Sequence, residues 1–266
     1  MNVLGFNERV WEKGRELYRD MPWRDTTEPY FVLVSELMLQ QTQVDRVIPK
    51  FELFMGTFPT IADLAIAPLS KVLTIWSGLG YNRRAKFLHE AARKVVAEYD
   101  GTIPDTYEGL VSLPGVGPNT AGAILAYSFN QPVVFIETNV RTVYFHHFFE
   151  NQPLVTDAEL KVLVAETIDK EHPREWYWAL MDYGSFLKKR GVGRINKSAQ
   201  YKKQAPLKGS LREIRGLILK ALATRDYAEP DLHNQLPDDE RFDRALSALK
   251  NEGFVTQTDG RLHLTR

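Results

Sequence analysis

Apolar residues recur at spacings of three and four along most of residues 1–187, which is the pattern of amphipathic helices. In YNRRAKFLHEAARKVVAEY, Ala85, Leu88, Ala92 and Val95 share one helical face. This helix is expected to end at Asp100-Gly101, because helices often end at glycine. Further helices are predicted at 31–42, 61–76, 106–112, 118–129, 138–149, 156–170 and 174–187. Residues 1–187 are therefore predicted to be all-α.

The pattern changes after Pro206. LREIRGLILKALA, EPDLHNQL and DERFDRALSALKNEG predict three helices, and FVTQTDGRLHLTR alternates around an Asp259-Gly260 turn, which predicts a β-hairpin. Three helices followed by a hairpin is the order of a winged-helix unit. Such units bind DNA through the third helix or serve as protein contacts, and the nearly balanced charge of this segment leaves both interpretations open. We predict a mainly α protein with a small winged-helix-like α+β unit at 206–266.

Composition narrows the class of protein. The chain has 266 residues, of which 44% are hydrophobic and 26% charged, as in ordinary soluble globular proteins. It has no signal-peptide pattern and no apolar run long enough to span a membrane, so a cytoplasmic protein is expected. The chain contains no cysteine, which excludes disulfides, thiolate-ligated zinc, iron–sulfur clusters held by the chain and cysteine nucleophiles.

Charge is unevenly distributed although the formal net charge is zero. Residues 188–208 contain eight Lys and Arg and no Asp or Glu, whereas residues 1–187 contain 17 Lys and Arg and 24 Asp and Glu. A concentrated basic segment in a neutral chain favours local contact with a polyanion. The alternative is a solvated linker.

LPGVGPNTAGAIL, residues 113–125, predicts a tight turn between two helices. Two glycines precede Pro118, which suits a first helical position, and small residues follow. A glycine-rich turn at a helix N-terminus exposes backbone N–H groups, which bind phosphate without reading a base sequence. The residues expected at this DNA-backbone contact are Gly115, Val116, Gly117, Asn119 and Thr120, together with Lys188, Lys189 and Arg190 of the basic segment.

LPGVG followed 20 residues later by a carboxylate resembles the helix-hairpin-helix (HhH-GPD) DNA glycosylases. SELMLQQTQV, GLGYNRRAKFL and LPGVGPNTAGAIL resemble the MutY branch of that superfamily, which removes adenine. The resemblance covers about residues 8–187. It implies a glycosylase domain at 1–205, with a six-helix barrel at about 21–130 and a second helical subdomain built from 1–20 and 131–205.

The resemblance places Glu36 where the family protonates the base. The sequence agrees, because a carboxyl in the apolar helix FVLVSELML should have a raised pKa, as a general acid near neutral pH requires. A structural acid paired with an arginine is the alternative.

Other positions are assigned by resemblance alone. Trp23 and Arg24 match residues near the base pocket, while Gln41, Leu79 and Tyr81 match residues that wedge into the duplex when the base leaves it. Leu79 and Tyr81 also suit an ordinary core. Asn119 stands where bifunctional relatives have a lysine nucleophile, and since asparagine cannot form a Schiff base, no lyase activity is expected. The backbone carbonyls of Val111, Leu113 and Val116 match a Na⁺ or K⁺ site.

FIETNVRTV places Glu137 where the family has a catalytic aspartate, which stabilises positive charge on the sugar. Glutamate keeps the charge but moves it by about one methylene. Helix N-capping is the alternative role. Asn139 matches a residue that helps hold the water and the carboxylate.

Two further departures limit the comparison. KKRGVGRINKSAQYKKQ replaces the four-cysteine iron–sulfur loop, and the domain that recognises 8-oxoguanine is not evident. The resemblance implies a monomeric, nucleoid-associated, monofunctional base-excision glycosylase without an iron–sulfur cluster. Its partner would be duplex DNA with a mispair or damaged base, first adenine opposite guanine or 8-oxoguanine. Alternatives are thymine or uracil mispairs, alkylated or deaminated bases, and a non-catalytic DNA-binding protein.

Overall fold

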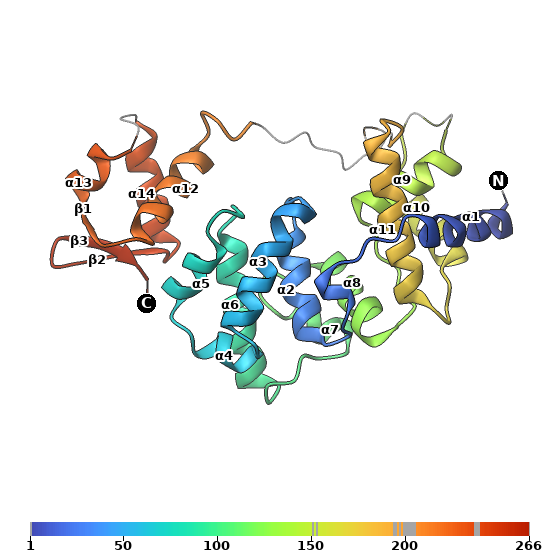
Figure 1. Cartoon of the computed structure of the whole chain (residues 1–266), viewed down its shortest axis with the longest axis horizontal. Coiled ribbons are helices and arrows are strands. Elements are labelled where there is room, and N and C mark those ends of the chain that lie inside the picture. Colours follow the sequence, from blue (N-terminus) through green and yellow to red (C-terminus); the bar gives the residue numbers. More distant parts are fainter. Residues whose placement is uncertain are drawn as a thin grey trace. The chain divides into compact units, whose positions relative to one another are not determined.

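A computed structural model of the chain describes residues 2–150, 152, 154–193, 196, 198, 206–236 and 240–265. It is mainly helical, which confirms the predicted fold class (Figure 1). The chain divides into two compact units, and each is described by itself. The first contains Met1–Glu36, Pro104–Ser112 and Val116–Lys203; the second contains Leu37–Ile103, Leu113–Gly115 and Gln204–Arg266.

The first unit is built around α11 (Pro173–Lys189), which packs on α1 (Val3–Glu16), α8 (Pro118–Phe129) and α9 (Thr138–His147). The crossing of α1 and α11 is close, because a Cβ on Gly14 would lie 2.4 Å from Cβ of Ala179. Trp176 and Tyr177 are fully buried in this core. The unit also contains η1 (Pro22–Arg24), α7 (Tyr107–Val111), α10 (Asp157–Thr167) and most of α2 (Pro29–Leu39).

The second unit contains four further helices, α3 (Val44–Thr57), α4 (Ile61–Ile66), α5 (Leu69–Trp76) and α6 (Arg83–Glu98). Phe54 of α3 packs on Phe58 and on Trp76 of α5, and all three rings are buried. The prediction of one helix over 61–76 was wrong, since α4 ends at Ile66 and α5 begins at Leu69. Pro68 causes the break. It disfavours helical backbone at Ala67, which is extended at ψ 146°.

The remainder of the second unit has the winged-helix order. It contains α12 (Leu211–Leu222), β1 (Tyr227–Ala228), α13 (Glu229–Asn234), α14 (Arg241–Asn251), β2 (Val255–Thr258) and β3 (Arg261–Leu264). The strands form an antiparallel sheet in the order β1-β3-β2, with Val255 opposite Leu264 and Tyr227 opposite Leu262. The three helices and the hairpin were predicted. The two-residue strand β1 was not, because its pairing to β3 has no local signal.

Within the described residues, no helix is both long enough and apolar enough to cross a membrane. Most of the predicted basic segment beyond Gly193 lies outside these residues.

Candidate active site

The segment between α8 and α9, which leads to Glu137, is fixed by Tyr177 of α11. The Tyr177 hydroxyl donates to the Val133 carbonyl at 2.8 Å and accepts from the Phe135 N–H at 3.3 Å. The Phe135 ring stacks on Tyr177, with ring centroids 4.0 Å apart. On the other side, Gly122 of α8 makes room for Phe135, because a Cβ at Gly122 would lie 2.7 Å from Cβ of Phe135.

Asn119 of α8 fixes the residue next to Glu137. Its Nδ2 donates to the Ile136 carbonyl at 2.9 Å, and its Oδ1 accepts from the Ile136 N–H at 3.3 Å. The side chain therefore satisfies both backbone groups of the residue before the carboxylate. The predicted base-pocket and DNA-backbone roles of Asn119 stay predictions, but its contacts show that it positions the Glu137 backbone.

Glu137 is the N-cap residue of α9, yet its side chain makes no capping hydrogen bond. Only its backbone carbonyl takes part in the helix, accepting from the Arg141 N–H at 2.9 Å. The carboxylate is therefore not occupied by the capping role considered from the sequence. Burial raises the pKa of Glu137 to about 6, with the Arg141 charge acting in the opposite direction.

Glu36 lies on α2 among buried apolar residues, as the sequence predicted. Burial raises the pKa of Glu36 well above its usual range, and the nearby charge of Glu137 raises it further. The two carboxyl groups are thus close enough to interact electrostatically. Because the Glu137 charge raises the pKa of Glu36, Glu137 ionises at lower pH than Glu36, which is the order that acid-assisted bond cleavage requires.

Tyr127 of α8 joins this pair and was not identified from the sequence. Its pKa is raised well above the usual range by burial and by the charges of Glu36 and Glu137, so the hydroxyl keeps its proton. The ring packs on Phe135 and Trp178 at centroid distances of 6.1 and 6.3 Å. A single large polar residue among the small residues of α8 was the available signal.

Asn139 lies in the first turn of α9 and is held by α11. Its Nδ2 contacts Met181 Sδ at 3.7 Å, and its Oδ1 accepts from Lys188 Nζ at 3.3 Å. Gly184 makes this approach possible, because a Cβ there would lie 2.3 Å from the Asn139 carbonyl oxygen and 2.7 Å from Asn139 Cα. The sequence contains no local sign that this glycine is required.

We expect Gly184→Ala to displace the N-terminus of α9, because the added Cβ would overlap the Asn139 backbone. Overpacking of this kind costs about 1–3 kcal/mol of stability. A shift of about 1 Å at the carboxylate should lower the single-turnover cleavage rate roughly 100-fold. Gly216→Ala is the matched control, since Gly216 lies in α12 with open space around it, and it should leave the rate unchanged. A wild-type rate for Gly184→Ala would contradict this account of α9.

Trp23 and Arg24 are buried in the first unit. Arg24 makes two hydrogen bonds to Asp182, Nη1 to Oδ2 at 2.8 Å and Nη2 to Oδ1 at 3.1 Å, and its guanidinium lies 5.3 Å from the Trp178 ring centroid. Arg24 also lowers the pKa of Tyr127, so its charge acts on the same residue as the charges of Glu36 and Glu137. The ion pair fixes Arg24, and the predicted base-pocket role of Trp23 and Arg24 stays a prediction.

The predicted wedge residues all belong to the second unit. Gln41 is exposed with φ 56°, and Tyr81 is partly exposed with φ 48°. Leu79 is only 3% exposed, so its side chain is part of the core in this conformation. A wedging role for Leu79 requires it to leave that core, and the role stays a prediction for all three residues.

The hairpin motif has the predicted turn. Gly115 has φ 78°, and a Cβ there would lie 2.7 Å from Cβ of Phe87; Gly117 is the N-cap of α8 and Pro118 its first residue. Gly117 and Asn119 are exposed, Thr120 is partly exposed and Val116 is buried. Lys188, Lys189 and Arg190 are exposed at the end of α11. Their DNA contacts, and the cation site at the carbonyls of Val111, Leu113 and Val116, stay predictions.

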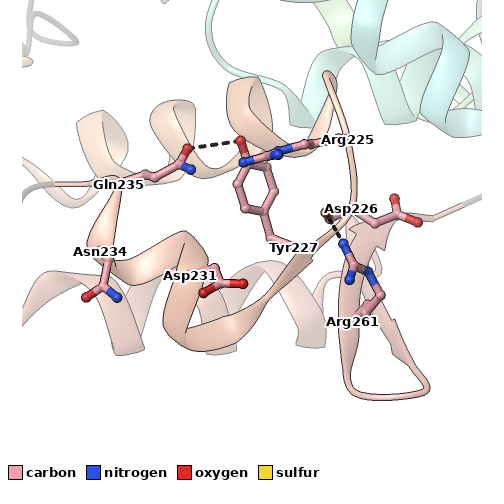
Figure 2. A pocket seen from close by; sticks show the side chains of 7 residues that line it. All are labelled: Arg225, Asp226, Tyr227, Asp231, Asn234, Gln235 and Arg261. Atoms are coloured by element: carbon pink, nitrogen blue, oxygen red, sulfur yellow. Dashed lines mark hydrogen bonds between the residues drawn. The ribbon is translucent and has the colours of Figure 1, made fainter.

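A separate cavity of about 350 Å³ lies in the winged-helix-like unit (Figure 2). Arg225 and Arg261 line it together with Asp226 and Asp231, and the Tyr227 hydroxyl donates to Gln235 Oε1 at 3.0 Å. The opposed charges favour no particular charged ligand. Glu36, Tyr127 and Glu137 do not line this cavity, so it is separate from the predicted catalytic carboxyl groups.

The sequence has no cysteine and therefore cannot hold an iron–sulfur cluster through thiolates. Within the described ranges, no group of three or more His, Asp and Glu side chains is placed to bind a metal ion.

Residues 34–166 match the family model described as "HhH-GPD superfamily base excision DNA repair protein". The chain belongs to this superfamily. The match includes Glu36, the hairpin and Glu137, and it confirms the resemblance inferred from LPGVG and the carboxylate that follows.

Individual relatives agree with this assignment. An adenine DNA glycosylase of Mycobacterium tuberculosis (strain CDC 1551 / Oshkosh) is 33% identical over 273 residues, which cover 93% of this chain and 89% of the relative. That of Buchnera aphidicola subsp. Baizongia pistaciae is 34% identical over 64% of this chain, which spans 48% of that relative. Among solved structures, a thermostable thymine-DNA glycosylase has a TM-score of 0.63 at 26% identity, covering 69% of this chain and 86% of that one.

Proposed function

We propose that this protein is a monofunctional DNA glycosylase of base excision repair, which extrudes a mispaired or damaged base and hydrolyses its N-glycosidic bond. Adenine opposite guanine or 8-oxoguanine is the first proposed substrate, supported by the adenine DNA glycosylases among its relatives. The observation that carries the proposal is the pair of buried carboxyl groups, in which burial raises both pKa values and the Glu137 charge raises that of Glu36 further, so that Glu137 ionises first.

In the proposed reaction Glu36 donates its proton to a ring nitrogen of the base. The bond between C1′ and the base then breaks, its electron pair leaves with the base, and positive charge develops on the sugar. The Glu137 carboxylate stabilises that charge. Water attacks C1′ and gives a proton to Glu137, and exchange with solvent returns both groups to their starting state.

The neighbours of Glu137 set its position and charge. Asn119 fixes the preceding peptide, and Asn139, which contacts Lys188 and Met181, would hold the attacking water. The Tyr127 hydroxyl, which remains protonated, supplies a donor near both carboxyl groups. Since Asn119 offers no amine, the product is an abasic site with an intact strand.

A second candidate substrate is thymine or uracil mispaired with guanine. The likeness to a thymine-DNA glycosylase supports it. The glutamate at 137, longer by about one methylene than the family's aspartate, is compatible with a pocket of different size.

A panel of end-labelled duplexes tests the proposal. Each duplex carries one A·G, A·8-oxoguanine, T·G or U·G pair or an alkylated base, and is incubated with the protein and then treated with hot alkali. We expect alkali-dependent cleavage at the adenine of A·G or A·8-oxoguanine and no break without alkali. Cleavage of T·G or U·G alone selects the second candidate, and tight binding to a mispair with no cleavage of any duplex rejects the enzyme.

A further inference from the structure

Cationic side chains surround the loop of residues 77–82 between α5 and α6 in the second unit. Arg46 of α3 donates to the Gly78 carbonyl, and Lys50 Nζ donates to the Ile75 carbonyl at 3.1 Å. Neither forms an ion pair with a carboxylate in the part of the chain that the structure describes. Their oxygen partners are neutral, so both positive charges remain available to an anion.

Arg84 lies beneath this loop and fixes its shape. Its Nη1 donates to the carbonyls of Leu37 and Met38, both at 2.8 Å, and its Nη2 donates to the Gly80 carbonyl at 3.0 Å. Burial lowers the pKa of Arg84 to about 10, so it stays charged at neutral pH. The buried Arg84 guanidinium, which is hydrogen-bonded to backbone oxygens on both sides, links the end of α2 to the loop and fixes the position of one relative to the other.

The winged-helix-like unit contributes to the same loop through Arg212, in the first turn of α12. Arg212 Nη1 donates to the Tyr81 hydroxyl. The guanidinium groups of Arg212 and Arg84 lie 5.4 and 5.5 Å from the Tyr81 ring centroid. Such distances are those of cation–π contacts. Arg46, Lys50 and Arg212 are here called the cationic collar of this loop.

Hydrogen bonds at the end of α14 connect the winged-helix-like unit to α6. Glu252, which follows α14, accepts two hydrogen bonds of 2.8 Å from Arg215 and one of 3.2 Å from Arg83. Its backbone carbonyl accepts from Lys86, whose Nζ also lies 5.5 Å from the Phe254 ring centroid. This end of the third helix is therefore engaged within the protein.

The outward side of α14 has no cationic bias. Asp243, Arg244 and Ser247 are exposed there, so one acidic and one basic side chain balance each other in charge. A helix that enters the major groove of DNA as a separate reader meets phosphates on both sides, and positive charge favours that entry. The collar has the charge that such a contact needs, whereas this side of α14 does not.

We propose that the winged-helix-like unit binds the phosphodiester backbone of duplex DNA jointly with the loop of residues 77–82, through the cationic collar, and not as a separate sequence-reading module through α14. The choice of DNA as the polyanion rests on the proposed glycosylase function. Backbone contact of this kind adds affinity without base preference.

The test measures binding of the full chain to an undamaged, fluorescently labelled duplex by anisotropy, at salt concentrations from about 50 to 200 mM. Each lost phosphate contact reduces the slope of log affinity against log salt by about 0.9. We expect Arg46→Met and Arg212→Met each to reduce it by about that amount. Arg244→Met, which removes the same charge from the exposed side of α14, should leave it unchanged.

Other results would overturn the proposal. A smaller slope for Arg244→Met with no change for Arg212→Met would make α14 the DNA-binding element. A lower melting temperature of Arg212→Met with an unchanged slope would make the Tyr81 contact purely structural. More than about tenfold preference among unrelated duplexes, lost in Arg244→Met, would establish sequence reading. Because the duplex is undamaged, failure of the glycosylase proposal leaves this measurement interpretable.

Discussion

Glu137→Gln should reduce the single-turnover rate of base removal by roughly 100- to 1,000-fold, the usual effect of losing a group that stabilises transition-state charge. The amide keeps the shape of the side chain but cannot stabilise a cationic sugar. Duplex affinity should change little. Cleavage is measured with enzyme in excess, and affinity by anisotropy on the same substrate. Glu166→Gln, an exposed substitution on α10, is the control and should retain the wild-type rate. Wild-type cleavage by Glu137→Gln would remove Glu137 from the mechanism.

Glu137→Asp shows what the longer side chain does. Asn119 and Tyr177 fix the backbone leading to position 137, so the aspartate carboxylate would be withdrawn by about one methylene. If the site is built around glutamate, Glu137→Asp should cleave more slowly than the wild type. Faster cleavage would show instead that glutamate is a compromise at a position suited to aspartate.

Glu36→Gln should lower the rate by roughly 100- to 10,000-fold, the range for loss of a general acid. The pH profile provides a specific check. Wild-type activity should fall below about pH 6 as Glu137 gains a proton, and again at higher pH as Glu36, whose pKa is raised by burial and by the Glu137 charge, loses its own. In Glu36→Gln the fall at higher pH should disappear while the acid fall remains. If the fall at higher pH were unchanged, it would belong to another group.

The same variant should be more stable than the wild type at neutral pH. Folding raises the pKa of Glu36 above its ordinary value of 4.5. As the pH rises past that value the unfolded chain ionises while the folded chain does not, which favours unfolding. The gain in melting temperature of Glu36→Gln should therefore be small at acid pH and grow as the pH rises. A gain independent of pH would indicate a packing effect.

The sequence predicted features that depend on neighbouring residues. Pro118 and Asn130 bound α8 at the predicted residues, and Asp259-Gly260 forms the hairpin turn. Glu36 was predicted to have a raised pKa because its own helix is apolar. The break at Pro68 was also available locally and was missed because apolar periodicity continues across it.

Features that depend on packing between distant segments were not predictable. Tyr127 stands out as the one large polar residue of α8, but its sequence neighbours do not show that the charges of two distant carboxyl groups act on it. The need for Gly184 arises only because α9 crosses α11 at that residue. Arg84 stands within an amphipathic helix pattern, while three of the carbonyls that it contacts are more than 40 residues away. The identity and spacing of residues in the sequence show which chemical groups the chain has. Which of those groups lie close together depends on the tertiary structure.

The paired hydrogen bonds between Asn119 and Ile136 have a consequence for insertions and deletions. The side-chain amide of Asn119 forms the two hydrogen bonds that a peptide group of a neighbouring strand would form. It fixes the chain at Ile136 only. The turn at residues 130–132 lies outside this fixed point, so its length can change without moving the carboxylate. An insertion between Ile136 and Glu137 would separate the carboxylate from its anchor. Sequence variants of the first kind should keep activity, and those of the second kind should lose it.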